Sequence, residues 1–481
     1  MKTENTFGRL LILLFLTWFI CVGLYWLPER ICGQKIKKVD LFSDIRQKPE
    51  PLSLDSLIFQ LEQADTWVID SAAIRDSIIQ AGVMDSVALV VRDSLYHTLY
   101  ALQGGDSLGT RIEDYSIGHI GLKHFFEALN KSQSMNRPVR IAFLGDSFIE
   151  GDIVVADFRE AMQKEFGGHG VGFVPVSSVA SQFRPTIDQQ SKGWERHSIL
   201  SDKEYPYVLS GMVFEAMEEE VSLSFKTVDR YPSLKEVSSL KFLYQSNEGA
   251  ILNLTYNGLE DTIRTLLPPA SQVEQYVLDE WITEASLTFK EAEGLHALGI
   301  ALEDNSGVVV DNFSLRGNSG LLLMHLDSAQ CRAFQHIRPY DLIVLQYGLN
   351  IVSEEMLQYG WYRKRMVEVI GHLRNCFPET DILMLGVSDR SYQQDGEFMT
   401  MPAVLALLHA QRQAAKQAGI PFWNVFGAMG GENSMVKFVE KNWASKDYTH
   451  LSFRGGREIA KALFEALKLE KEFYDEADLA D

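Results

Sequence analysis

The chain has 481 residues, which predicts two or three domains, and its 46% apolar and 11% aromatic residues exclude a wholly disordered chain. Its formal net charge of −20 argues against nucleic-acid binding, because an acidic surface repels phosphate backbones. The four cysteines, Cys21, Cys32, Cys331 and Cys376, are too few and too scattered for a disulfide framework or a zinc knuckle.

An uncharged run of 18 residues, 10–27, lies near the N-terminus. It is long enough to span a bilayer as a slightly short helix, and Trp18, Tyr25 and Trp26 suit interfacial positions. No A-x-A cleavage site follows, so residues 1–30 are interpreted as an uncleaved membrane anchor rather than a signal peptide. A buried apolar helix is the alternative. The polar stretch 31–115 is interpreted as a helical stalk or spacer.

After Pro138 the pattern changes to that of an α/β domain. Residues 139–144 form a β-branched and aromatic run that predicts a strand. A helix is expected next, because Phe158, Met162 and Phe166 recur every four residues and Gly167-Gly168 provides a stop. We assign 116–176 to the first part of this domain.

Residues 177–307 have a different pattern of polar and apolar residues. Short runs, several of them alternating polar and apolar residues, predict strands at 221–225, 240–244, 251–256 and 285–289. Turn residues such as 246–249 separate them. This pattern predicts an antiparallel β-sandwich inserted into the α/β domain.

The alternation of strands and helices returns in residues 308–481. Strands are expected at 342–345, 382–385 and 422–426. Met366, Ile370 and Leu373 mark a helix between the first two, and a C-terminal helix carries apolar residues at 459, 463 and 467. Together with 116–176 this predicts a parallel sheet covered by helices on both faces.

Two motifs follow predicted strands of that sheet. Gly145-Asp146-Ser147 places an exposed serine at a strand end, where open α/β sheets bind ligands and where a helix N-terminus offers free N–H groups. Gly348-Leu349-Asn350 places an amide that can donate to developing negative charge. Taken alone, the first could be a helix cap and the second an ordinary turn.

A third motif, Asp447-Tyr448-Thr449-His450, precedes the C-terminal helix. An aspartate three residues before a histidine can hold one ring nitrogen while the other accepts a proton from a serine. An aspartate cap beside a structural histidine is the alternative.

In this order, GDS, GxN and DxxH resemble the motifs of the SGNH (GDSL-type) hydrolase superfamily. GDSFIEGD followed by FGGHGVGFVP is similar to bacterial envelope members that carry an inserted β-domain, including peptidoglycan O-acetylesterases. The resemblance covers about 116–176 and 308–481. It implies an SGNH-type three-layer α/β/α domain interrupted by the inserted antiparallel sandwich.

The resemblance also implies roles for individual residues. Ser147 would be the nucleophile, His450 the base and then the acid, and Asp447 the residue that orients His450. The oxyanion hole would comprise the Ser147 N–H group, Gly317 and Asn350. Gly320 competes with Gly317 for its place, and Phe148 departs from the leucine common in GDSL-type proteins. No cofactor and no metal are implied.

Three further features are expected to be structural. Asp152 follows a glycine at the start of the helix after the serine and is expected to cap it. His169 lies in a glycine-rich turn that could border the site. Trp194 and Trp281 could stack on sugar rings, although core positions are the usual place for tryptophan.

The sequence therefore predicts a membrane-anchored serine esterase that removes O-acetyl groups from a cell-envelope glycan, either peptidoglycan or another acetylated polysaccharide. One alternative is a glycan O-acetyltransferase that works with a membrane acyl-donor partner, and another is a non-catalytic glycan-binding envelope protein. Positive charges on both sides of residues 10–27 weakly favour a cytoplasmic body. The short N-terminal tail and the expected function favour an extracytoplasmic body on the inner membrane, which is the localisation we expect.

Overall fold

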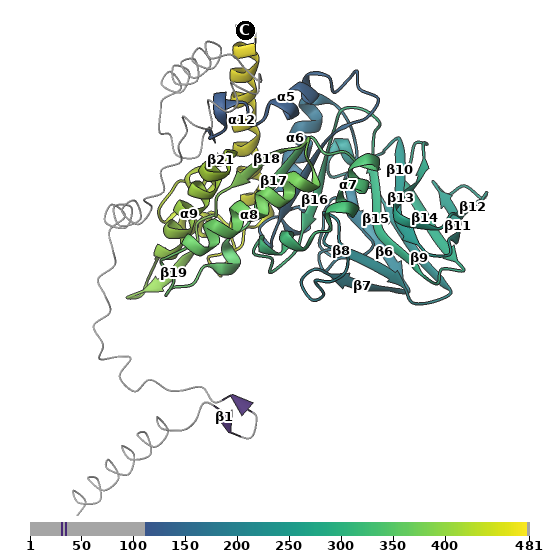
Figure 1. Cartoon of the computed structure of the whole chain (residues 1–481), viewed down its shortest axis with the longest axis horizontal. Helices are drawn as coiled ribbons and strands as arrows, with labels where there is room; N and C mark the ends of the chain where they lie inside the picture. The colour runs from purple at the N-terminus through teal and green to yellow at the C-terminus, as the bar shows by residue number, and fades with distance from the viewer. Residues whose placement is uncertain (1–29, 32–33, 36–110, 479–481) are drawn as a thin grey trace, which may run out of the picture. The chain divides into compact units, whose positions relative to one another are not determined.

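The computed structural model describes residues 30–31, 34–35 and 111–478 (Figure 1). The predicted anchor at 10–27 and most of the predicted stalk lie outside these residues. Among the helices that are described, none combines the length and apolar character needed to cross a bilayer. Within the first unit of the chain, residues 1–53, two short strands form an antiparallel hairpin: β1 (Arg30–Ile31) and β2 (Gln34–Lys35).

The second unit, residues 54–481, is built around a six-stranded sheet that is parallel except at one edge. In spatial order its strands are β16 (Val308–Ser314), β4 (Val139–Gly145), β17 (Leu342–Gln346), β18 (Asp381–Leu385), β21 (Pro421–Trp423) and the antiparallel β3 (Ile112–Asp114). Every residue of β4 and β17 is buried. This explains why their sequences are mainly apolar, with Arg140 in β4 and Gln346 in β17 as the polar exceptions, because a parallel strand is covered on both faces.

Helices cover both faces of this sheet (Figure 1). One layer contains α5 (Lys123–Asn130), α6 (Val155–Phe166) and α12 (Phe453–Asp478). The other contains α7 (Ser328–Ile337), α8 (Gly360–Cys376) and α9 (Pro402–Ala418). The mixed α/β class expected from the sequence is confirmed.

Short helices and one hairpin complete the connections. The α-helical pieces are α10 (Val425–Met429) and α11 (Ser434–Glu440). The single turns of 3₁₀ helix are η1 (Ile117–His119), η2 (Glu150–Asp152), η3 (Pro232–Leu234), η4 (Leu321–His325) and η5 (Leu349–Ile351). The hairpin pairs β19 (Ser391–Gln394) with β20 (Glu397–Thr400).

The strand expected at 422–426 is shorter than predicted. It ends at Trp423, and α10 begins at Val425. The side chain of Asn424 accepts a hydrogen bond from the Gly427 N–H group and caps the helix. The apolar pair Val425 and Phe426 therefore belongs to a buried helix, which a short apolar run resembles as closely as it resembles a strand.

Between α6 and β16 the chain forms two antiparallel sheets. The first contains β13 (Ala270–Leu278), β10 (Ser239–Ser246), β15 (Leu295–Glu303), β8 (Met212–Ala216) and β7 (Trp194–Ser198), and β5 (Gly172–Pro175) pairs with β15. The second contains β12 (Ile263–Leu267), β11 (Ala250–Tyr256), β14 (Glu284–Lys290), β9 (Glu220–Lys226) and β6 (Asp188–Lys192). Because β5 is one of its strands, the first sheet begins at Gly172, upstream of residue 177, where the sequence predicted the start of the inserted domain.

The two sheets enclose a core of alternating residues, such as Val221, Leu223 and Phe225 of β9. Phe242 of the first sheet packs on Phe289 of the second, with ring centroids 4.5 Å apart. Alternation of this kind is what a half-buried strand requires.

A buried cluster of charges joins the first of these sheets to the parallel sheet. The carboxylate of Glu303, at the end of β15, lies 2.6 Å from Arg140 Nη2, 2.6 Å from Lys241 Nζ and 2.8 Å from Arg338 Nη1. Burial raises the pKa of Glu303, but the three cations lower it by more than burial raises it. The pKa of Glu303 is therefore held well below its usual range. The carboxylate is therefore ionised, and it stabilises three buried cations at once.

Replacing Glu303 with glutamine is expected to lower the free energy of unfolding by about 3–5 kcal/mol, because buried cations lose their counter-charge. Urea unfolding followed by circular dichroism measures the change. Glu220→Gln is the matched control, since Glu220 forms an exposed pair with Lys290 and its loss should change stability by less than about 1 kcal/mol. Equal effects of the two substitutions would contradict the expectation.

Candidate active site

The predicted nucleophile lies two residues after the end of β4, the second strand of the sheet. Ser147 is almost buried, in a tight turn where the Phe148 N–H group donates to Asp146 Oδ1 at 2.9 Å. The turn needs glycine at position 145, because an added Cβ would lie 2.8 Å from the Ile149 side chain and 3.0 Å from the Gln346 carbonyl oxygen. The close approach of β4 to β17 thus explains the glycine of the GDS motif.

The histidine and aspartate of the third motif reach the serine from the loop before α12. Ser147 Oγ lies 3.1 Å from His450 Nε2, and His450 Nδ1 lies 2.7 Å from Asp447 Oδ2. An ionised carboxylate can only accept hydrogen bonds, so the ring proton belongs on Nδ1. Nε2 is then free to accept the serine proton.

The Asp447 carboxylate is held in its charged form. Burial raises its pKa, but hydrogen bonds from the Ser445 hydroxyl and from the backbone and ring of His450 lower it below its usual range. The Thr449 N–H group also donates to Oδ1, at 3.0 Å. A carboxylate fixed by several donors keeps both its charge and its direction toward the imidazole.

The loop that carries this pair is supported by the β19–β20 hairpin. Tyr448 has a positive φ of 55°, which few residues other than glycine adopt. Its ring stacks on Phe398 with centroids 3.7 Å apart and an interplanar angle of 7°. The Ser391 N–H group donates to the Tyr448 carbonyl oxygen at 3.1 Å. These contacts hold the strained residue between Asp447 and His450.

Asn350 also lies at this edge, in η5 after β17. Its Nδ2 donates to Asp146 Oδ2 and to the Asn318 carbonyl oxygen, each at 2.9 Å. Both amide hydrogens are therefore engaged in this structure. Donation to a substrate oxyanion requires one of the two bonds to be released or shared.

Gly317 and Gly320 differ in the use of their N–H groups. The Gly320 N–H donates to Asn318 Oδ1 at 2.9 Å. Within the described part of the chain, neither the Gly317 nor the Ser147 N–H group donates to a protein acceptor. Gly317 therefore has the donor that an oxyanion hole needs, whereas the Gly320 donor is already occupied.

Asp146 is a further residue of the site, to which the sequence patterns assigned no role of its own. Its side chain is fully buried and contacts Asn350 and the Phe148 N–H group. Burial raises the pKa of Asp146 to about 6, against the lowering effects of Phe148, the charge of His450 and the Asn350 amide. Its place inside the GDS motif was the available signal.

The sequence predicted that Asp152 caps the following helix, and this prediction is wrong. Its carboxylate is buried and accepts hydrogen bonds from Arg159 Nη1 at 3.2 Å, Arg184 Nε at 3.0 Å, Thr186 Oγ1 at 2.5 Å and Asn312 Nδ2 at 2.7 Å. Burial raises its pKa, but Arg159 and Arg184 lower it below the usual range. Four side-chain donors, three of them distant in the sequence, outcompete the local backbone, so Asp152 links the serine turn to β16 and to the loop 176–187.

Other residues weighed from the sequence lie elsewhere. His169 pairs with Asp304 at 2.6 Å on an exposed turn. Trp194 packs edge-on against Phe289 in the sandwich, while Trp281 is exposed. Within the described residues, no three His, Cys, Asp or Glu side chains form a group that could hold a metal ion.

No protein-family model matches the sequence, and neither does any curated protein. Its fold does match solved structures. A peptidoglycan O-acetylesterase superposes with a TM-score of 0.59 at 20% sequence identity, over 74% of this chain and 98% of the other. The chain has the SGNH hydrolase fold.

Two further solved structures superpose less well. A family two carbohydrate esterase from Cellvibrio japonicus gives a TM-score of 0.26 at 12% identity, over 64% of this chain and 99% of the other. A GDSL-like lipase from Parabacteroides merdae gives 0.28 at 16% identity, over 34% and 74%.

The raised pKa of Asp146 predicts a pH-dependent contribution to the stability of the SGNH domain. Between its ordinary pKa of 3.8 and about 6, the folded state holds a proton that the unfolded chain has released. Stability should therefore fall as pH rises through this window, by up to about 3 kcal/mol from this group. In the Asp146→Asn variant this decrease of the unfolding free energy with pH should be absent, because the amide does not titrate.

Urea unfolding at several pH values between 4 and 7 measures the slope for the wild type and the variant. Asp261→Asn, on an exposed turn, is the control and should retain the wild-type slope. A slope in Asp146→Asn equal to that of the wild type would show that Asp146 titrates normally.

Proposed function

We propose that this chain is a serine esterase that removes O-acetyl groups from a glycan of the cell envelope. The proposal rests on one observation above all: Ser147, His450 and Asp447 form a continuous hydrogen-bonded chain at the carboxyl edge of the parallel sheet. The structural match to a peptidoglycan O-acetylesterase supports this class of substrate.

The first half of the reaction forms an acetyl-serine. Ser147 Oγ attacks the ester carbonyl carbon as its proton passes to His450 Nε2, and Asp447 stabilises the resulting imidazolium. The C–O bond to the sugar then breaks, and His450 returns the proton to the departing sugar oxygen. In the second half, water attacks the acetyl carbon with His450 as base, and acetate leaves with Ser147 restored.

Negative charge develops on the carbonyl oxygen in both halves. Among the described residues neither the Ser147 nor the Gly317 N–H group has a protein acceptor, so both can donate to it, and the Asn350 amide lies in the loop beside them. An oxyanion is a stronger acceptor than the Asn318 carbonyl oxygen, so we expect Asn350 to exchange that bond for one to the substrate.

We further propose that residues 10–27 anchor the protein in the inner membrane with its body on the extracytoplasmic side. The uncharged run supports the anchor, and an envelope-glycan substrate supports this orientation. Protease added to spheroplasts, in which the outer membrane is opened, should then degrade the body, and a protected body would contradict the orientation.

Acetate release from acetylated cell-wall glycan tests the activity. The wild-type protein should release acetate, and Ser147→Ala should release none, because the acyl-enzyme cannot form. Ser134→Ala, an exposed serine in the loop after α5, is the matched control and should retain wild-type release. Transfer of acetyl groups to a glycan acceptor, without release of acetate, would instead indicate an O-acetyltransferase.

Asn350→Ala is expected to lower kcat by about 10²–10³, because one oxyanion donor is lost, while KM changes little. Steady-state hydrolysis of a small activated acetate ester provides both constants. A change in KM alone would show that Asn350 contributes to binding and not to the transition state. Thermal unfolding confirms that the variant is folded.

A further inference from the structure

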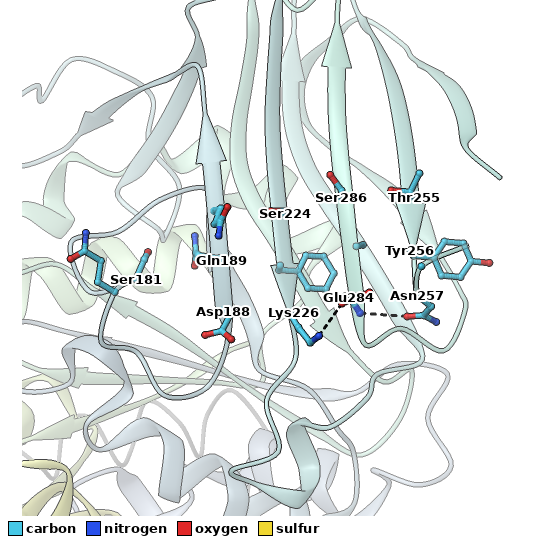
Figure 2. Close-up of a pocket in the computed structure, with 15 residues that line it drawn as sticks. Ser181, Asp188, Gln189, Ser224, Lys226, Thr255, Tyr256, Asn257, Glu284 and Ser286 are labelled. Atoms are coloured by element: carbon cyan, nitrogen blue, oxygen red, sulfur yellow. Dashed lines mark hydrogen bonds and ion pairs between the residues drawn. The ribbon is translucent and has the colours of Figure 1, made fainter. Parts of the chain in front are cut away.

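The outer face of the second sandwich sheet carries a hollow away from the SGNH site. Residues of β9, β11 and β14 alternate, so that Leu223, Leu287 and Leu254 face the core while their neighbours face outward. The hollow on the outward side has a volume of about 640 Å³ (Figure 2). That volume lies within the range of sites that bind small ligands.

The floor of the hollow is a row of hydroxyl side chains. Ser224, Ser286 and Thr255 lie opposite one another on three adjacent strands, β9, β14 and β11. Directly opposed side chains in a sheet lie close together, so short ones leave open space above them. Long side chains on the outer face would fill this space. The hydroxyls therefore form a polar shelf.

The end of the hollow carries charge that is mostly neutralised. Lys226 Nζ lies 3.2 Å from a Glu284 carboxylate oxygen, and Asn257 accepts a hydrogen bond from the Glu284 N–H group (Figure 2). Asp188, opposite Lys226 in the register, adds one negative charge. A ligand rich in negative charge would find no unpaired cation here, whereas a neutral polyhydroxylated chain matches hydroxyls and amides.

One wall of the hollow belongs to the loop that contacts the serine turn. Ser181 and Gln182 line the hollow. The next residue, Phe183, is 48% exposed, and its ring packs so closely over Gly151 that an added Cβ would lie 2.5 Å away. Arg184 then pairs with buried Asp152 at 2.9 Å. Loop 176–187 thus connects the hollow to the residues just after Ser147.

We propose that this hollow is a second, non-catalytic site that binds a neutral stretch of a glycan strand. The identity of that strand as the acetylated substrate rests on the proposed function. The hydroxyl shelf hydrogen-bonds to sugar hydroxyls, and the exposed ring of Phe183 offers an apolar face for a sugar ring on the path toward the serine. The loop fixes the distance between the two sites.

The test uses the full-length protein and a soluble oligosaccharide of N-acetylglucosamine without O-acetyl groups, so binding does not depend on ester hydrolysis. In the double variant Ser224→Gln/Ser286→Gln, two longer side chains fill the shelf. The matched control is Ser222→Gln/Thr288→Gln, since these residues form the next directly opposed pair on the same two strands and do not line the hollow.

Calorimetric titration should show that the shelf variant binds the oligosaccharide about tenfold more weakly than the wild type, because two hydroxyl contacts are lost. The control pair should retain wild-type affinity, and thermal unfolding should show that both variants fold. Ser147→Ala should bind as the wild type does.

Equal affinities of the shelf and control variants, or no binding of the neutral oligosaccharide by the wild type, would overturn the inference. Preferential binding of a polyanion such as polyglutamate, lost in the shelf variant, would also overturn it. These results leave the proposed function standing if acetate is still released. Conversely, glycan binding that depends on the shelf, with no acetate release, would support the second site and refute the esterase.

Discussion

The register of three parallel strands is the constraint on which the site depends. Gly145 at the end of β4 lies opposite Ser314 of β16 on one side and Gln346 of β17 on the other. All three strands therefore end at the same level, and the loops that follow them start side by side. Ser147 is two residues after Gly145, and Asn350 is four residues after Gln346. A small displacement of β4 relative to β17 would therefore separate Ser147 from Asn350.

Buried carboxylates then fix the inserted sheets relative to these strand ends. Asp152 connects the serine turn with β16 and with loop 176–187, and Glu303 connects β15 with β4 and with Arg338. Each is ionised in a dry environment and satisfied by several cations or donors. Such clusters are costly to break and so hold two parts of a chain in one geometry. In this protein they link the sandwich to the turn that carries Ser147.

Much of the SGNH domain was predictable from local patterns. The β-branched run before Gly145 predicted β4, and the four-residue spacing of apolar residues after it predicted α6. A strand buried on both faces is apolar throughout, whereas a helix buried on one face is apolar every three or four residues. Ser147, His450 and Asp447 were identified by motif, and the structure brings them together. The strand at 422–426 was predicted too long, because the cap formed by Asn424 is a matter of side-chain geometry and a short apolar run suits either element.

The sequence by itself determined the elements and the order of the motifs, since apolar periodicity and turn residues act over a few positions. Only the tertiary structure decided what the buried acids do. Asp146 holds Asn350, and Asp152 binds two arginines and Asn312 rather than a helix end. Their partners lie up to about 200 positions away in the chain. The hollow above Ser224 and Ser286 likewise exists only because the register of β9 and β14 places two short side chains opposite each other.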